Sequence, residues 1–136
     1  MTHYLLDTHH AAALWRGHSP LVARVDASPD AAFHLCVSTV GELWYRVWDS
    51  VRPSEHERTL LAFLARSRIL DFDDAAAVEF GRIKTALRKI SRPISDIDAQ
   101  IAAIARAREM TVLTAEQHFS VVGGLRVENW LASSAA

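Results

Sequence analysis

Four acidic residues that are far apart in the sequence lie beside the ends of predicted strands or in the first turn of predicted helices. They are Asp7, Glu42, Asp98 and Glu116. Carboxylates that share one pocket repel each other, so they stay ionised together only around a cation. Oxygen ligands of this kind suit a hard divalent ion such as Mg²⁺ or Mn²⁺ in octahedral geometry. Such an ion polarises a phosphate and lowers the pKa of a bound water, so these acids indicate phosphoryl chemistry.

The predicted helix that carries Asp98 has the clearest pattern in the chain, and it runs from about residue 95 to residue 109. An apolar stripe at spacings of four and three is formed by Ile97, Ile101 and Ile104. Ser95 is a suitable N-cap for this helix. Asp98 lies on the neighbouring face, above Ala102, and small residues there leave open space around the carboxylate. We therefore expect the other acids to converge on the start of this helix.

Strands alternate with helices along the chain. The predicted strands are residues 3–6, 33–37, 69–72, 111–114 and 125–128, and the predicted helices are about 8–16, 21–27, 38–50, 55–67, 73–92 and 95–109. A continuous apolar run such as 33–37 is typical of a strand in a buried parallel sheet. The pattern predicts one α/β domain with a central parallel sheet of four to five strands flanked by helices. Ligands of such sheets bind at the carboxyl ends of the strands.

Length and composition favour one compact domain. The chain has 136 residues, half of them apolar, which is enough to bury a core without disulfides. We place the domain at residues 1–132, with a short tail at 133–136. The single cysteine, Cys36, lies in an apolar run, so we expect a buried thiol. No run approaches about 18 apolar residues, so nothing is expected to span a membrane, and without a signal-like N-terminus a cytoplasmic protein is expected.

The basic residues are unevenly distributed although the formal net charge is only −1. Residues 82–92 carry five bases and no acid. This segment is either a solvated helix face that complements the helix dipole or a patch that contacts phosphates.

Each acid has a simpler explanation when it is taken alone. Thr39 and Glu42 have the spacing of a capping box, and Ser95 and Asp98 have the same spacing. Asp7 or Thr8 could be an N-cap, and Glu116 could be solvated. Capping explains less well why four acids lie at the same end of the predicted strands. A zinc site is disfavoured, since neighbouring His9 and His10 diverge on a helix and no His/Cys spacing fits.

Five stretches of the sequence carry a resemblance to a known family. They are Leu5-Leu6-Asp7-Thr8, Val37-Ser38-Thr39-Val40-Gly41-Glu42-Leu43, Asp98-Ala99-Gln100-Ile101-Ala102-Ala103, Val112-Leu113-Thr114-Ala115-Glu116-Gln117-His118-Phe119 and Gly124-Leu125-Arg126-Val127-Glu128-Asn129-Trp130. Together they resemble a PIN-domain nuclease, of the kind found in VapC-type toxins of bacterial toxin–antitoxin pairs. The resemblance covers nearly the whole chain.

The resemblance implies a role for each residue of the site. Asp7, Glu42 and Asp98 would bind the metal, and Glu116 stands where the family usually has Asp or Asn, so it would bind the metal directly or through water. Thr8 and Thr114 fall on hydroxyl positions that line the family's site. Asp96 is an extra acid, which is either a supporting residue behind the metal ligands or a favourable charge at the helix start.

The resemblance also implies an activity and partners. It implies a homodimeric endoribonuclease that uses Mg²⁺ or Mn²⁺ to cleave tRNA, rRNA or mRNA. A VapB-type antitoxin would insert a peptide across an apolar groove, and candidate groove residues are Leu14, Trp15, Trp44, Trp48 and Leu64. A non-catalytic PIN-like module that binds RNA or protein is the alternative. A phosphotransfer or phosphatase domain is a third hypothesis, although position 9 is His where a haloacid-dehalogenase-like enzyme would have a second Asp.

Overall fold

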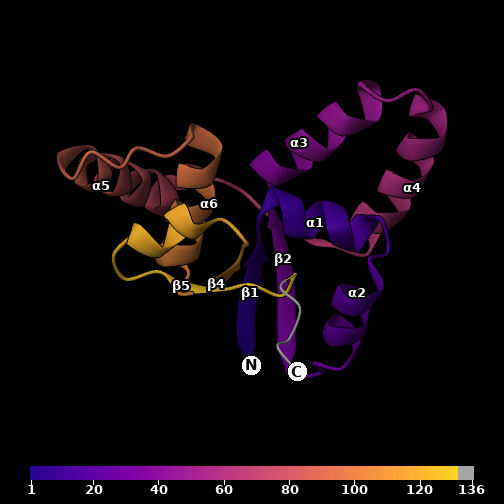
Figure 1. The fold of residues 1–136 in the computed structure, drawn as a ribbon, viewed down its shortest axis with the longest axis horizontal. Helices are drawn as coiled ribbons and strands as arrows, with labels where there is room; N and C mark the ends of the chain where they lie inside the picture. The colour runs from indigo at the N-terminus through magenta and orange to yellow at the C-terminus, as the bar shows by residue number, and fades with distance from the viewer. Residues whose placement is uncertain (132–136) are drawn as a thin grey trace.

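The computed structural model describes residues 1–131, and the tail predicted at 133–136 lies outside them. A parallel sheet of five strands forms the centre, and its strand order is β3-β2-β1-β4-β5 (Figure 1). The strands are β1 (Thr2–Leu6), β2 (Ala31–Cys36), β3 (Arg68–Leu70), β4 (Thr111–Leu113) and β5 (Arg126–Glu128). The predicted fold class is confirmed, and all four junctions of the sheet pair strands in parallel, as crossover helices require.

Within residues 1–131, six α-helices and one 3₁₀ helix connect the strands. They are α1 (Thr8–Trp15), α2 (Ser19–Asp26), α3 (Val37–Trp48), α4 (Pro53–Ala65), α5 (Asp74–Lys89), α6 (Asp96–Ala107) and η1 (Gln117–Val121). Helices α2 and α4 begin earlier than predicted because each has a proline in its first turn, where the missing N–H has no intrahelical partner to lose. None of these helices, which belong to residues 1–131, is long and apolar enough to cross a membrane.

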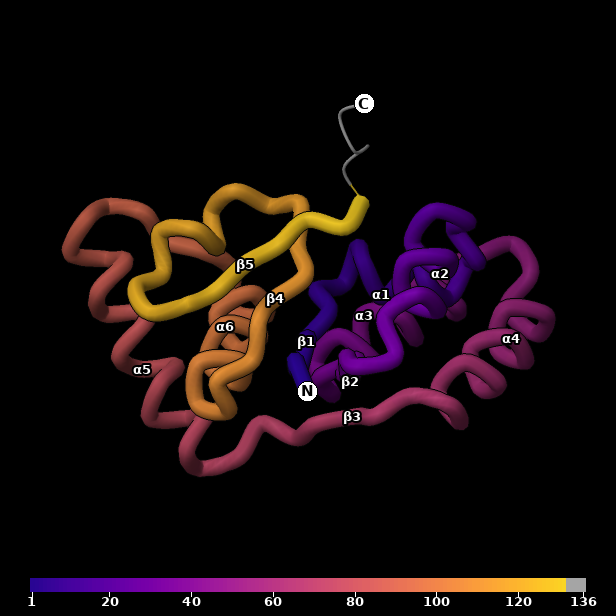
Figure 2. Tube along the Cα trace, turned by 90° about the horizontal axis from the view of Figure 1, so that it is seen from below, coloured from indigo at the N-terminus to yellow at the C-terminus, as the bar shows by residue number. Residues whose placement is uncertain are grey.

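Neighbouring residues in the central strands face opposite sides of the sheet, since side chains alternate along a strand. Leu5 and Cys36 pack with α5 and α6, whereas Leu6 and Leu35 pack with α1, α3 and α4. Figures 1 and 2 show these two helical layers on opposite sides of the sheet, with β3 and β5 at its two edges. Cys36 is fully buried, as predicted. The apolar residues of β2 therefore contribute to two cores, and the expected apolar run is interrupted by the buried polar residue His34.

An ion-pair network connects α5 with α6. The guanidinium of Arg106 donates through Nε to Glu79 Oε2 at 2.8 Å and through one terminal nitrogen to the carbonyl of Gly123 at 2.9 Å. Arg82 also donates to Glu79 Oε1 at 3.0 Å. The hydrogen bond from Arg106 holds the pKa of Glu79 below its ordinary value. The ionised carboxylate is therefore the form that the folded protein stabilises.

We expect Glu79→Gln to destabilise the protein more at neutral pH than in acid. A carboxyl whose pKa is lowered by folding contributes stability above its unfolded pKa and loses that contribution as pH falls through its folded pKa. Urea unfolding of both proteins at about pH 7 and about pH 3 measures the difference, which should be smaller at the second pH than at the first. An equal gap at both pH values would contradict this account of Glu79.

Candidate active site

Asp7 lies at the carboxyl end of β1 and begins α1. Its backbone N–H donates to the carbonyl of Leu113 in β4 at 3.0 Å, and its side chain is the N-cap of α1. Oδ1 accepts the backbone N–H of His10 at 2.8 Å and lies 3.1 Å from Nδ1 of the His10 ring. The capping interpretation of Asp7 is therefore correct. The cap occupies Oδ1 and does not use the second carboxylate oxygen.

Asp7 is buried and its pKa nevertheless lies below the ordinary value. Burial is the largest influence and raises the pKa, but the hydrogen bonds from the His10 ring, the His10 backbone and the Thr114 side chain together outweigh it. Only 2% of the residue is exposed. The site therefore contains a buried, anionic carboxylate, which is an unusual group to keep without a positive partner.

Thr114 connects Asp7 to Glu116. Its hydroxyl oxygen accepts the backbone N–H of Glu116 at 3.0 Å, and its backbone N–H donates to the carbonyl of Glu128 at 2.9 Å. The side chain also contributes to the low pKa of Asp7. Thr8, the other predicted hydroxyl residue, is the half-buried first residue of α1. Both threonines thus lie where β1 and β4 end.

Asp98 lies in the first turn of α6 and does not complete the capping box. Ser95 is the N-cap, and its Oγ accepts the backbone N–H of Asp98 at 3.2 Å. The Asp98 carboxylate instead faces η1, where Oδ2 lies 2.9 Å from Nε2 of His118. The cap is therefore made by Ser95 alone, and the carboxylate of Asp98 is directed toward the segment that follows β4.

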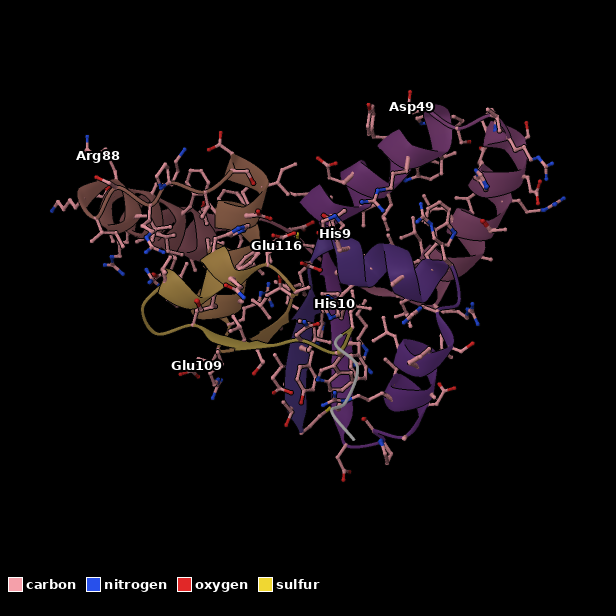
Figure 3. All side chains as sticks on the ribbon, viewed as in Figure 1. His9, His10, Asp49, Arg88, Glu109 and Glu116 are labelled. Carbon is pink, nitrogen blue, oxygen red and sulfur yellow. The ribbon has the colours of Figure 1, made fainter. Side chains whose placement is uncertain are left out.

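Glu116 lies between two histidines. Its Oε1 is 3.5 Å from Nδ1 of His9, and its Oε2 is 3.9 Å from Nδ1 of His118. Figure 3 shows His9 and Glu116 close together where α1 approaches η1, while the labelled Asp49, Arg88 and Glu109 lie at the periphery. A chain of contacts therefore runs from α1 through Glu116 and His118 to Asp98 in α6.

Glu42 is placed by α3, which begins earlier than the sequence pattern predicted. The N-cap is Cys36, and Thr39 is a buried residue inside the helix whose Oγ1 lies 3.5 Å from the sulfur of Cys36. The capping box of Thr39 and Glu42 was wrong for this reason. Ser38, one turn before Glu42, hydrogen-bonds Gln100 of α6. Residues four apart share a helix face, so the half-buried Glu42 lies on the side of α3 that meets α6.

Asp96 is separate from these acids. It is the first residue of α6, and its exposed carboxylate forms an ion pair with Lys84 of α5. This position matches the interpretation of Asp96 as a favourable charge at the helix start.

The acids have the right chemistry for a hard divalent cation, but their side chains are directed elsewhere. Within residues 1–131, no group of three or more His, Cys, Asp or Glu side chains is clustered closely enough to hold a metal ion. Asp98 and Glu116 are directed at histidines instead. Carboxylate oxygens are the ligands that Mg²⁺ and Mn²⁺ prefer. Glu116 and His118 have side chains that are 44% and 36% exposed, so both can turn without disturbing the core.

Three histidines of this site were not among the predicted site residues. His9 and His10 diverge as expected, with His9 exposed against Glu116 and His10 fully buried against Asp7. His118 contacts Asp98 from another segment of the chain. The spacing of three between Asp7 and His10 was a usable signal, because an N-cap residue approaches the third residue after it. No spacing indicates the pairing of His118 with Asp98.

A family model described as "PIN domain" matches residues 4–125, which include all four acids. The chain belongs to the PIN-domain family. Among its PIN-domain relatives, the tRNA(fMet)-specific endonuclease VapC of Shigella flexneri is 36% identical over 99 residues, which cover 71% of this chain and 75% of that protein. Ribonuclease VapC2 of Haemophilus influenzae is 33% identical over 135 residues, which cover 96% of this chain and all of that protein.

Solved structures of PIN-domain proteins agree with this assignment. The DNA-bound VapBC structure from Salmonella typhimurium superposes with a TM-score of 0.88 at 26% identity, covering 96% of this chain and 99% of that one. The VapBC2 structure from Rickettsia felis has a TM-score of 0.89 at 24% identity, covering 95% and 99%, and it supports the fold alone. This PIN domain is therefore a ribonuclease of the VapC type, a class of nuclease that generally depends on a divalent metal ion.

Proposed function

We propose that Asp7, Glu42, Asp98 and Glu116 hold Mg²⁺ or Mn²⁺ and that the chain is an endoribonuclease toxin, neutralised by a VapB-type antitoxin. One observation carries the assignment of the site. The buried anion Asp7 is joined through Thr114 to Glu116, and Glu116 is joined through His118 to Asp98. Acids that follow β1, precede η1 and lie in the first turn of α6 are therefore linked at the carboxyl end of the sheet, where ligands of α/β folds bind.

Each residue has a distinct task in this proposal. The bound ion would polarise the scissile phosphate and lower the pKa of the attacking water. Asp7 provides a carboxylate that is already anionic and fixed by hydrogen bonds. Asp98 and Glu116 provide carboxylates that now contact histidines. These carboxylates become available to the ion when the side chains of Glu116 and His118 rotate away from their present contacts. Thr8 and Thr114 provide hydroxyls at the rim.

We further propose that the antitoxin docks beside α2 and α4 and that the toxin is a homodimer. A cleft of about 460 Å³ lies there, and its lining includes Leu14, Phe33 and Phe63. Of the predicted groove residues, Leu14 lies in this cleft, whereas Trp15 lines a second one.

Trp48 is 59% exposed and stacks on Trp44 with ring centroids 5.4 Å apart. The Salmonella structure is a VapBC assembly, which supports a partner of this kind.

The activity is tested by incubating the purified chain with total RNA in the presence of Mg²⁺ or Mn²⁺, or of EDTA. We expect discrete cuts with either metal and none with EDTA, because the water is activated only at the ion. The cut ends would show whether tRNA, rRNA or mRNA is the target. We also propose that the protein acts in the cytoplasm, where these RNAs are found. Cuts of equal intensity in EDTA would contradict the proposal, and RNA binding without cleavage, indifferent to metal, would favour the non-catalytic module.

A further inference from the structure

His10 is a buried histidine whose two ring nitrogens are both occupied. The residue has no exposed surface. Nδ1 lies 3.1 Å from Oδ1 of Asp7, and Nε2 lies 3.1 Å from the backbone nitrogen of Trp130. The ring therefore connects Asp7, the first residue after β1, with Trp130, which lies 120 positions after His10 in the chain.

The contact with Trp130 fixes which nitrogen of His10 carries the proton. A backbone N–H can only donate, so Nε2 must accept and must be unprotonated. A neutral imidazole then carries its proton on Nδ1, which donates to Oδ1 of Asp7. The backbone N–H of His10 donates to the same oxygen at 2.8 Å. Two donors on one oxygen hold the carboxylate in a single orientation and leave the other oxygen free of His10.

Trp130 is itself held firmly, so its backbone is a fixed reference for the ring. Its indole is buried against Tyr4 and Phe33, with centroid distances of 4.9 and 5.5 Å, and the guanidinium of Arg24 lies 4.1 Å above it. The indole N–H donates to Glu128 Oε1 at 3.0 Å. The segment after β5 is thereby anchored to the sheet next to Asp7.

We infer that His10 is a positioning residue for metal binding. Its ring orients the carboxylate of Asp7, and the backbone N–H of Trp130 determines which ring nitrogen carries the proton that Asp7 accepts. This inference rests on the proposed role of Asp7 as a metal ligand. Groups that orient metal ligands generally contribute about 10- to 100-fold to metal affinity. His10 has no exposed surface, so it acts through Asp7 and not by touching RNA.

Two substitutions separate the two contacts of the ring. In His10→Asn, the amide nitrogen takes the place of Nδ1, so the donor to Asp7 is kept and the acceptor for Trp130 is lost. In His10→Gln, the amide oxygen takes the place of Nε2, so the Trp130 contact is kept and the donor to Asp7 is lost. We expect His10→Gln to weaken Mn²⁺ binding to the full chain by about 10- to 100-fold, and His10→Asn to restore most of the affinity.

Calorimetric Mn²⁺ titration of both variants, with thermal melting of each in EDTA, makes the comparison. Equal Mn²⁺ affinity in the two variants would overturn the inference, because a role in packing alone would show only in the melting temperatures. Asp7→Asn is the reference. If it binds Mn²⁺ like the wild type, the proposed role of Asp7 fails. If Asp7→Asn no longer binds Mn²⁺ while His10→Gln binds it with the affinity of the wild type, only the proposed role of His10 fails.

The wild-type chain provides a second test that does not depend on how the variants fold. Long-range ¹⁵N–¹H correlation spectra distinguish the two neutral tautomers of a histidine ring. We expect the Nδ1-protonated form for His10, and the Nε2-protonated form would overturn the inference.

Discussion

Asp98→Asn is expected to reduce RNA cleavage by at least about a hundredfold, which corresponds to about 2.7 kcal/mol of lost transition-state stabilisation. The amide keeps the shape of the side chain and removes the negative charge that the metal ion requires. The start of α6 does not depend on the carboxylate, because Ser95 caps the helix through the backbone N–H of residue 98. Cleavage should therefore be lost while the far-UV circular dichroism spectrum and the melting temperature in EDTA stay close to those of the wild type.

Asp96→Asn is the matched control for this experiment. Asp96 lies two residues earlier on the same helix and loses the same charge, but its carboxylate pairs with Lys84 at the surface. Exposed ion pairs contribute only about 0–1 kcal/mol, so stability should change little, and cleavage should remain near that of the wild type. Equal losses of cleavage in the two variants would mean that the overall charge of the helix start matters and that Asp98 has no special role.

Phe119→Ala is expected to lower the free energy of unfolding by about 3–5 kcal/mol, which is a large part of the 5–15 kcal/mol typical of a domain. Phe119 is fully buried in the core formed with α5 and α6. Its ring stacks on His118 with centroids 4.9 Å apart and an interplanar angle of 29°. Truncation leaves a cavity under η1, so the positions of Glu116 and His118 should loosen as well. Urea unfolding measures the first effect and RNA cleavage the second.

Ser120→Ala is the control for Phe119→Ala. Ser120 is the next residue of η1, is exposed, and bonds only the carbonyl of Gln117 within its own turn. Substitutions at such surface positions usually change stability by no more than about 0.5 kcal/mol. A small effect of Phe119→Ala, comparable with that of Ser120→Ala, would show that η1 does not depend on its buried aromatic residue.

The sheet could be predicted from the sequence because its strands are short apolar runs between helical patterns. Burial on both faces makes a parallel strand apolar at successive positions, as in residues 31–36, where His34 is the one polar residue. Helix starts were less predictable. Thr39 looked like an N-cap by residue type, but β2 passes directly into α3 at Cys36, and tertiary packing decides that junction.

The sequence predicts where Asp7 and Asp98 lie relative to the strands and helices, but it does not predict the pairing of Asp98 with His118. That the acids form a metal site remains a proposal. Asp7 and Asp98 lie at positions where local patterns, a strand end and a helix start, already fix the backbone. The pairing of Asp98 with His118 depends on how η1 folds back across the start of α6. Such a contact is set by the relative placement of two elements, which no local spacing encodes. Residue bounds of the domain, 1–132, remain a prediction.

The convergence of sequence-distant acids on one ion is tested most directly by a Mn²⁺ titration of the wild type, Asp7→Asn and Asp98→Asn. Asp7 directly follows β1 and Asp98 lies in the first turn of α6, and these two elements are separated by most of the chain. We predict that each single substitution removes the same binding event from the titration, since the two carboxylates share one ion. If either variant binds Mn²⁺ with the affinity and stoichiometry of the wild type, the acids do not form a common metal site and the account is contradicted.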